Sequence, residues 1–291
     1  MPTDIIQWFP GHMAKTRRLI GENLRSVDAV FELRDAKLPV SSSNPEIDRL
    51  TDGKPRLILL NKSSLCDPSS LDAWTTRLSS AGNLCIATDC KTGEGIKSVP
   101  AALRELCSDR IKKFEEKGMK GRKLKVMVLG IPNVGKSTLI NRLSGGTRAK
   151  AEDRPGVTKE ISWYPTGLGF DLLDFPGLLW PRFDSRETAE NLAISGAIKN
   201  EIFDNETVAV ALIKKLRLFY PALLKARYRL GDDIDLNDPD LSDYDLFIAA
   251  ARKRGMLLRG GEADTERFAD ALLDDFRSCR IGRITLDRIL L

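Results

Sequence analysis

The sequence is poor in histidine, in paired cysteines and in long hydrophobic runs. It has one histidine, His12, and its five cysteines include no C-x-x-C pair, so a zinc site of cysteine and histidine is not expected. A disulfide framework is also not expected, because such frameworks belong to small exported domains rather than to chains of 291 residues. We predict instead that the cysteines are reduced and mostly buried as small apolar side chains: Cys66, Cys85, Cys90, Cys107 and Cys279.

The apolar runs are too short to cross a membrane. A typical run, residues 208–213, is far shorter than the roughly 20 residues that a membrane-spanning helix needs. The N-terminal stretch MPTDIIQWFPGH lacks the basic start and apolar core of a secretory signal. We therefore expect no membrane association and a cytoplasmic location. Hydrophobic residues make up 42% of the chain, which is ordinary for globular domains and argues against global disorder.

Charge is modest in total but clustered along the chain. The formal net charge is +5, and basic residues concentrate at 104–125, 208–231 and 252–259. Residues 232–245 carry seven aspartates and no base, which is typical of a loop or a helix start. The basic blocks are solvated helix faces in one interpretation and a surface for phosphate backbones in the other, so they permit a nucleic-acid partner without establishing one.

Hydrophobic patterning predicts an α/β domain followed by a helical one. Short apolar strands alternate with helix-length segments up to Pro181, which favours a mostly parallel sheet with helices on both faces. The strands are expected at 29–33, 56–60, 84–88, 124–129 and 170–173, and the helices at 14–27, 69–81, 96–117 and 136–144. After Pro181 only helices are expected, at 187–200, 207–218, 243–254 and 265–277. The predicted domains are 1–184 and 185–291.

Residues 130–137, GIPNVGKS, fit the phosphate-binding pattern G-x-x-x-x-G-K-[ST] between a predicted strand and a predicted helix. Backbone N–H groups at such a helix N-terminus bind phosphates. Lys136 is expected to reach the outer phosphates and the Ser137 hydroxyl to ligate Mg²⁺. The predicted phosphate-binding residues are Asn133, Val134, Gly135, Lys136, Ser137 and Thr138, with Gly177 from a later segment.

A second segment has the D-x-x-G pattern at the end of a predicted strand. Asp174 is placed to hold Mg²⁺ through its water shell, and the Gly177 N–H to meet the γ-phosphate. Between the two motifs, the polar stretch 154–158 suits a switch loop, and its Thr158 is a candidate second hydroxyl ligand for Mg²⁺.

Two segments upstream of these motifs resemble guanine-binding loops. Asn61 and Lys62 follow the second predicted strand, where many GTPases use asparagine to contact the base and lysine to pack over it. Asp89-Cys90-Lys91 follows the third predicted strand, and its backbone at Cys90 resembles the loop that meets guanine O6. Together these segments form the set that a GTPase needs, but the guanine-reading segments precede the phosphate-binding loop.

This order resembles that of circularly permuted GTPases. With IQWFPGHMAK at 6–15 and LLDFPGLLWP at 172–181, the sequence is similar to the YlqF/RbgA family of ribosome-assembly GTPases over nearly the whole chain. The resemblance implies a circularly permuted P-loop GTPase domain followed by a small all-helical domain that contacts ribosomal RNA. It also implies GTP and GDP as ligands, Mg²⁺ as cofactor, the large ribosomal subunit as partner and a monomeric protein.

The resemblance further implies roles for three residues. Leu178 stands where many GTPases carry a water-positioning glutamine, so another group must orient the attacking water. His12 is the family's candidate for that catalytic role, since an imidazole suits water positioning near pH 7. Asn133 matches the P-loop asparagine associated with potassium dependence and is the candidate K⁺ ligand.

Two positions depart from the family pattern. The family's N-K-x-D reads Asn61-Lys62-Ser63-Ser64, so the carboxylate that would accept from guanine N1–H and its 2-amino group is missing. Ser64 accepts only weakly and Asp67 is expected to point elsewhere, which predicts weakened guanine selectivity. The other departure is Phe175, which replaces a small residue beside the γ-phosphate glycine.

Three functions remain open at this point. The leading one is a GTP-hydrolysing factor of late large-subunit maturation, stimulated by the subunit and binding ribosomal RNA in a nucleotide-dependent way, because segment 174–181 runs directly into the helical domain. The second is a nucleotide-binding RNA scaffold with weak or no hydrolysis and relaxed guanine selectivity. The third is a signalling or metabolic NTPase without an RNA partner, against which the basic blocks argue.

Overall fold

The computed structural model describes residues 11–80, 83–146, 161–181, 183, 185–198 and 204–289, and for residues 11–14 it describes the backbone only. The chain divides into two compact units. The first unit comprises residues 1–184 with 287–291, and the second comprises residues 185–286. The sequence pattern places 287–291 in the helical domain, but the structure groups these residues with the first unit, because Asp287 and Ile289 make their contacts there.

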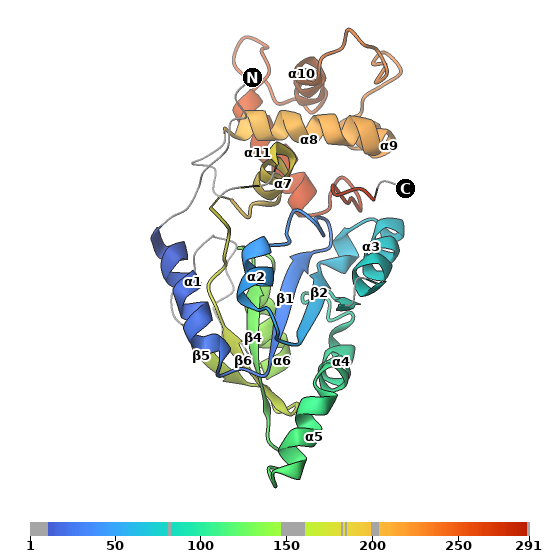
Figure 1. The fold of residues 1–291 in the computed structure, drawn as a ribbon. Coiled ribbons are helices and arrows are strands. Elements are labelled where there is room, and N and C mark those ends of the chain that lie inside the picture. The colour runs from blue at the N-terminus through green and yellow to red at the C-terminus, as the bar shows by residue number, and fades with distance from the viewer. Residues whose placement is uncertain are drawn as a thin grey trace. The chain divides into compact units, whose positions relative to one another are not determined.

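A mostly parallel six-stranded sheet forms the centre of the first unit (Figure 1), which confirms the predicted α/β fold. The strand order is β3-β2-β1-β4-β6-β5, and only β5, paired with β6, is antiparallel. The sequence pattern does not predict this edge strand. The strands are β1 (Ala29–Asp35), β2 (Arg56–Asn61), β3 (Leu84–Ala87), β4 (Leu124–Gly130), β5 (Ser162–Pro165) and β6 (Phe170–Asp174).

The central strands are rich in apolar residues, as expected for strands buried on both faces. All seven residues of β1 are buried, and five of the six in β2. Of the two acidic residues of β1, Glu32 in the middle of the strand is buried and paired with Arg34 at 2.6 Å and Arg56 at 3.2 Å. Phe31 and Phe170 meet edge to face at 6.0 Å between ring centroids, which packs β1 against β6 across β4.

Six helices of the first unit are described. The predicted helix 96–117 is in fact a 3₁₀ turn followed by two helices that meet at Cys107, whose backbone leaves the helical region. Helix α2, which begins with Asn44 as its side-chain cap and Pro45 in its first turn, is not predicted from the hydrophobic pattern. The helices are α1 (Gly11–Leu24), α2 (Pro45–Leu50), α3 (Pro68–Ser80), α4 (Val99–Leu106), α5 (Ser108–Glu116) and α6 (Lys136–Ser144).

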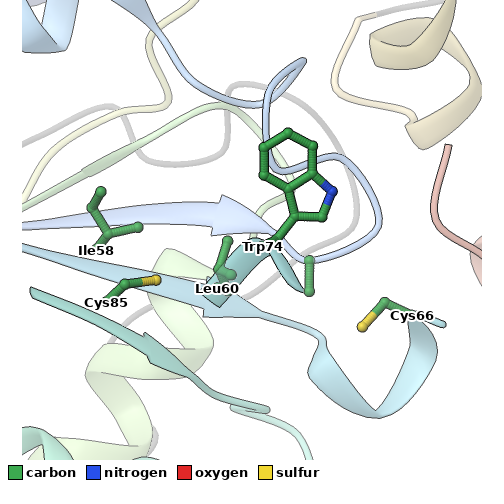
Figure 2. Packing of buried hydrophobic residues seen from close by; sticks show 6 residues of the cluster. Ile58, Leu60, Cys66, Trp74 and Cys85 are labelled. Atoms are coloured by element: carbon green, nitrogen blue, oxygen red, sulfur yellow. The ribbon is translucent and has the colours of Figure 1, made fainter. Parts of the chain in front are cut away.

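An apolar cluster joins α3 to the sheet and receives the end of the chain. Figure 2 shows Trp74 from α3 beside Ile58 and Leu60 from β2 and Cys85 from β3. Ile289 packs against this cluster, and the Trp74 indole N–H donates to the Asp287 carbonyl at 3.1 Å. The last described residues are thus fixed to the first unit by both apolar and polar contacts.

The regular elements in the described part of the second unit are all helices, joined by loops, apart from an isolated bridge between Leu257 and Ala263. Helix α9, which starts with Pro221 directly after α8, is missing from the sequence prediction. The core of the second unit includes three aromatic rings. The ring centroid of Phe268 lies 5.4 Å from that of Tyr228 and 5.0 Å from that of Phe247. The helices are α7 (Arg186–Ser195), α8 (Asn205–Phe219), α9 (Pro221–Tyr228), α10 (Asp243–Lys253) and α11 (Thr265–Arg277).

The cysteines are free thiols, and all but Cys279 are buried, as predicted. Burial raises the pKa of Cys85 and Cys90 to about 12, so both stay protonated at neutral pH. Throughout the described ranges, no helix is both long and apolar enough to cross a bilayer.

Candidate nucleotide-binding site

The strand order of the sheet indicates where a ligand would bind. From β1 the chain moves outward to β2 and β3 and then returns to β4 on the other side of β1, so the order reverses between β1 and β4. Ligands of open α/β sheets bind outside the carboxyl ends of the strands at such a point. The four predicted motifs follow β2, β3, β4 and β6, so all of them lie at that edge despite their permuted order (Figure 1).

The loop after β4 has the backbone of a phosphate cradle. Gly130 and Gly135 have φ values of 155° and 102°, and Asn133 has a φ of 58°. A Cβ at Gly130 would lie 2.7 Å from the Leu33 carbonyl oxygen, so this position accepts only glycine. Helix α6 begins at Lys136, and its N-terminal N–H groups are directed to the same edge of the sheet.

Lys136 is buried within this loop. Its Nζ donates to the carbonyls of Ile131 at 2.8 Å and Gly130 at 3.2 Å. Burial lowers the pKa of Lys136 to about 8, and the nearby Asp174 only partly offsets this effect. The ammonium is therefore held where additional negative charge would stabilise it.

Asp174, the last residue of β6, is the matching buried acid. Within the described part of the chain its Oδ1 has no hydrogen-bond partner. Burial raises the pKa of Asp174 to about 6 despite the attraction of Lys136. An unsatisfied carboxylate oxygen near the P-loop lysine suits a hydrated divalent cation, so the chemistry of Asp174 and of the Ser137 hydroxyl at the start of α6 fits Mg²⁺. Thr158, the other predicted ligand, lies outside the described residues.

A zinc-type centre is not found in the described ranges, where no three His, Cys, Asp or Glu side chains converge.

The D-x-x-G segment packs directly against the phosphate-binding loop. A Cβ at Gly177 would lie 2.8 Å from Cα and N of Pro132, so the close approach requires glycine. The Leu178 N–H donates to the Gly130 carbonyl at 3.2 Å. The side chains of Leu178 and Phe175 are buried, which explains how an aromatic residue is accommodated beside the glycine.

Asn61 joins the two guanine-type loops to the phosphate-binding loop. Its Nδ2 donates to the Val134 carbonyl at 2.7 Å, and its Oδ1 accepts from the Cys90 N–H at 2.9 Å. Asn61 is buried, so it cannot be replaced without leaving these groups unpaired. Three residues predicted from separate motifs are thus brought together by one side chain.

The structure adds two residues that the motifs did not identify. Asp35 at the end of β1 pairs with Lys62 at 2.7 Å. Burial alone would raise the pKa of Asp35, but Lys62 and Lys37 outweigh it and hold that pKa below its usual range. Arg142 of α6 donates to the carbonyls of Cys90 at 3.2 Å and Lys91 at 2.5 Å. Asp35 could have been found from its place at a strand end, whereas Arg142 gave no local signal.

His12 is the second residue of α1, and its side chain lies outside what the structure describes. The remaining predicted phosphate-binding residue, Thr138, lies in the first turn of α6. The geometry therefore brings together the residues predicted to bind the nucleotide around Asn61, Lys136 and Asp174, and the catalytic role of His12 stays a prediction.

The two basic blocks of the second unit differ in how far their side chains are used in internal contacts. In the 208–231 block, Lys215 is buried against Glu187, Arg217 donates to loop carbonyls, and Arg227 pairs with Asp275. These three residues stabilise the fold. In contrast, the basic residues of 252–259 are exposed, beside two exposed leucines: Arg252, Lys253, Arg254, Arg259, Leu257 and Leu258.

An open cavity of about 650 Å³ lies in the second unit along α7, α8 and the start of α10. Its charged lining is mostly acidic: Arg186 and Lys214 against Glu187, Glu190, Glu206 and Asp243. This composition does not suit a phosphate backbone, so the cavity adds nothing to the basic surface at 252–259.

Comparisons with known proteins agree with this site. Residues 125–219 match the family described as 50S ribosome-binding GTPase. The chain is 42% identical to ribosome biogenesis GTPase A of Priestia megaterium, over 97% of this chain and 96% of that protein. It is 40% identical to the Bacillus cereus protein of the same name, over 97% and 94%, and 34% identical to mitochondrial ribosome-associated GTPase 1 of Mus musculus, over 98% and 91%.

Among the solved structures that match, two resemble nearly the whole chain. A GDP-bound YlqF has a TM-score of 0.63 and 26% identity, and the match covers 93% of this chain and 99% of that one. GNP-bound YlqF from T. maritima has a TM-score of 0.62 and 26% identity, with coverage of 94% and 98%.

Proposed function

The chain belongs to the ribosome biogenesis GTPase A family, and we propose that it hydrolyses GTP during assembly of the large ribosomal subunit. The observation that carries the proposal is the pair Lys136 and Asp174, two buried and oppositely charged groups at the carboxyl edge of the sheet. Burial disfavours the charged form of each group. The phosphates of GTP would supply negative charge to Lys136, and a divalent cation would supply positive charge to Asp174.

Phosphate binding is assigned to residues 133–138 and Gly177. Lys136 exchanges its carbonyl partners for the outer phosphate oxygens, and the N–H groups at the start of α6 bind the remaining ones. Ser137 and Asp174, with Thr158, would hold Mg²⁺, which when bound neutralises charge on the β- and γ-phosphate oxygens. Asn133 is the proposed K⁺ ligand. Asn61, Lys62 and Cys90 are assigned to the guanine base.

Hydrolysis requires a group that orients the attacking water. Leu178 is buried and apolar, so it cannot take this role. We assign this role to His12, because a neutral imidazole can orient water by accepting a proton or a hydrogen bond from it. Stimulation by the ribosomal subunit then amounts to placing α1, the helix that carries His12, over the γ-phosphate.

Ribosomal RNA is the proposed partner of the second unit. The exposed basic residues of 252–259 offer phosphate contacts, whereas half of the 208–231 block is used internally. We assign residues 1–184 with 287–291 as the GTPase domain and 185–286 as the RNA-binding domain of a monomeric, cytoplasmic protein. Because the D-x-x-G segment leads directly into the second unit, binding to the subunit is expected to depend on the nucleotide.

A scaffold without hydrolysis is less well supported. The relatives are named as GTPases, and the chain retains the P-loop lysine and the D-x-x-G carboxylate. An NTPase without an RNA partner is equally disfavoured, since the relatives are named for ribosome biogenesis or ribosome association.

The deciding experiment is GTP hydrolysis by the full chain, with and without large ribosomal subunits, at low and high potassium. We expect subunit-stimulated turnover that increases with potassium. His12→Ala should lower it by about 100-fold or more while GTP binding persists, and Lys15→Ala, an exposed change in the same helix, should not. Turnover at background level with subunits present would contradict the proposal.

A further inference from the structure

The loops after β2 and β3 are joined by a side-chain hydrogen bond. The Ser64 hydroxyl donates to Oδ2 of Asp89. Ser64 stands in the short 3₁₀ turn Ser63–Leu65, where it is half-buried, and Asp89 is buried two residues beyond β3. A carboxylate is therefore present within one hydrogen bond of position 64, although the sequence has a serine there.

The Asp89 carboxylate is fixed in place by its own loop. Its Oδ1 accepts from the N–H groups of Lys91 at 2.8 Å and Thr92 at 2.9 Å, which leaves Oδ2 on the side of Ser64. Burial alone would raise the pKa of Asp89, but the hydrogen bonds from Ser64, Thr92 and Lys91 outweigh it and lower that pKa. Asp89 is thus an ionised, oriented acceptor at neutral pH.

This acceptor lies next to the groups that connect to the phosphate-binding loop. Cys90, the following residue, donates its N–H to Asn61, whose amide donates to Val134 of that loop. Two other carboxylates near these loops are engaged elsewhere. Asp35 pairs with Lys62, and Asp67 accepts from the Ser69 N–H at 3.0 Å and from its hydroxyl at 2.8 Å.

Guanine presents two kinds of donor on one edge, the N1–H and the 2-amino group, so a protein that selects guanine must present acceptors to that edge. An ionised carboxylate is only an acceptor. A serine hydroxyl has one proton and two lone pairs, and here the proton is given to Asp89. The oxygen of Ser64 can therefore only accept from a ligand, and the pair presents acceptors alone.

We propose that Ser64 and Asp89 together form the acceptor for guanine N1–H and its 2-amino group, with Asp89 supplying the carboxylate that position 64 lacks. The inference rests on the proposed function, since it assigns the base-reading part of the same GTP site. It predicts strong guanine selectivity, opposite to the weakened selectivity expected from Ser64 alone. Asp89 is then a specificity-determining residue, and Ser64 acts through the direction of one hydrogen bond.

The direction of that bond can be reversed by Asp89→Asn. The new amide keeps its oxygen on the Lys91 and Thr92 N–H groups and turns its NH₂ toward Ser64, whose proton then points outward. The pair now presents a donor. A donor opposes guanine but suits xanthine, which carries an acceptor carbonyl where guanine has the 2-amino group.

The test is binding of GTP, ITP and XTP to the full chain by titration calorimetry. ITP lacks the 2-amino group, so wild type should bind GTP about tenfold or more tightly than either analogue. Asp89→Asn should weaken GTP binding by about 10- to 100-fold and reverse the preference to XTP. The double variant Ser64→Asp with Asp89→Asn restores an acceptor carboxylate and should recover the preference for GTP.

Asp67→Asn is the matched control, because Asp67 belongs to the same loop and its described partner is Ser69. It should leave the order of the three nucleotides unchanged. Equal binding of GTP and XTP by wild type, or an equal loss of all three nucleotides in Asp89→Asn, would overturn the inference while GTP binding stands. Failure of wild type to bind any of the three would instead contradict the proposed function.

Discussion

Asp287 and Ser41 are joined by two hydrogen bonds across 246 residues of sequence: the Ser41 N–H donates to Oδ2 at 2.6 Å and its hydroxyl to Oδ1 at 2.6 Å. The Val40 N–H donates to Oδ2 as well, at 2.7 Å. One carboxylate therefore fixes the loop that follows β1. This loop also donates through Asn44 to the Leu178 carbonyl at 2.9 Å, beside the D-x-x-G glycine.

We expect Asp287→Ala to lower the free energy of unfolding of the first unit by about 2–4 kcal/mol, because it leaves buried donors without their charged acceptor. Thermal unfolding followed by tryptophan fluorescence measures the loss, since Trp74 lies at the same contact. Asp52→Ala, an exposed change in the same unit, should have little effect. A variant as stable as wild type would show that the contact is dispensable.

Lys136→Met should stabilise the protein in the absence of nucleotide and abolish GTP binding. At pH 7 the folded protein holds a charged amine whose pKa is lowered to about 8, whereas in the unfolded chain it is near 10.5. Removing this charge should raise stability by about 1–3 kcal/mol, the loss of attraction to Asp174 being the opposing effect.

The lowered pKa of Lys136 also predicts how the stability of the protein changes with pH. The unfolded chain binds the extra proton between about pH 8 and 10.5, so wild-type stability should rise with pH over that window. Lys136→Met should lack this rise. Thermal unfolding with and without GTP and Mg²⁺ checks both properties, since ligand raises the melting temperature only where it binds. Lys112→Met, an exposed control in α5, should behave as wild type.

Much of the fold follows from local sequence because the central strands are short segments rich in apolar residues and the phosphate-binding loop has a strong pattern. The elements that the prediction missed are short. Strand β5 has only four residues with alternating burial, and α9 starts with Pro221 immediately after α8. Proline in a first turn is itself a helix-start signal, so α9 was open to prediction.

The site was less predictable than the fold. The motifs identified Asn61 and Cys90, but not that Asn61 bonds to Val134, because such contacts join residues 73 positions apart. Likewise, the missing carboxylate at position 64 indicates relaxed selectivity in the sequence, whereas the structure places Asp89 against Ser64. A sequence pattern specifies residue types at fixed spacing. It therefore does not show a carboxylate that reaches position 64 from another loop, as Asp89 does.

Asn61→Ala should destabilise the first unit and weaken binding of GTP and GDP to a similar extent. The change leaves the Cys90 N–H and the Val134 carbonyl unpaired, at a cost of about 1–3 kcal/mol for each buried group. Both nucleotides carry the base, so their affinities should fall together by about tenfold or more. Calorimetric titration measures this, with the exposed Asn237→Ala as control. A loss confined to GTP would assign Asn61 to the γ-phosphate side instead.

The second unit contains a buried carboxylate that predicts its acid sensitivity. Asp275 of α11 accepts two hydrogen bonds from Arg227, each at 2.8 Å, one from Arg280 at 2.6 Å and one from Tyr228 at 3.1 Å. Burial alone would raise the pKa of Asp275, but these donors outweigh it and hold that pKa below its usual 3.8. The folded state therefore favours the ionised form.

A carboxyl with a lowered folded pKa contributes stability that is fully present above the unfolded value and is lost as pH falls through the folded value. We expect Asp275→Asn to lower the stability of the second unit at pH 7 by about 2–3 kcal/mol, and to reduce its further loss below about pH 4. Scanning calorimetry of the full chain between pH 3 and 7 checks both, with the exposed Asp240→Asn as control. A variant that keeps the wild-type dependence on pH would assign the acid transition to other carboxylates, because the network around Arg227 and Arg280 could not then be its origin.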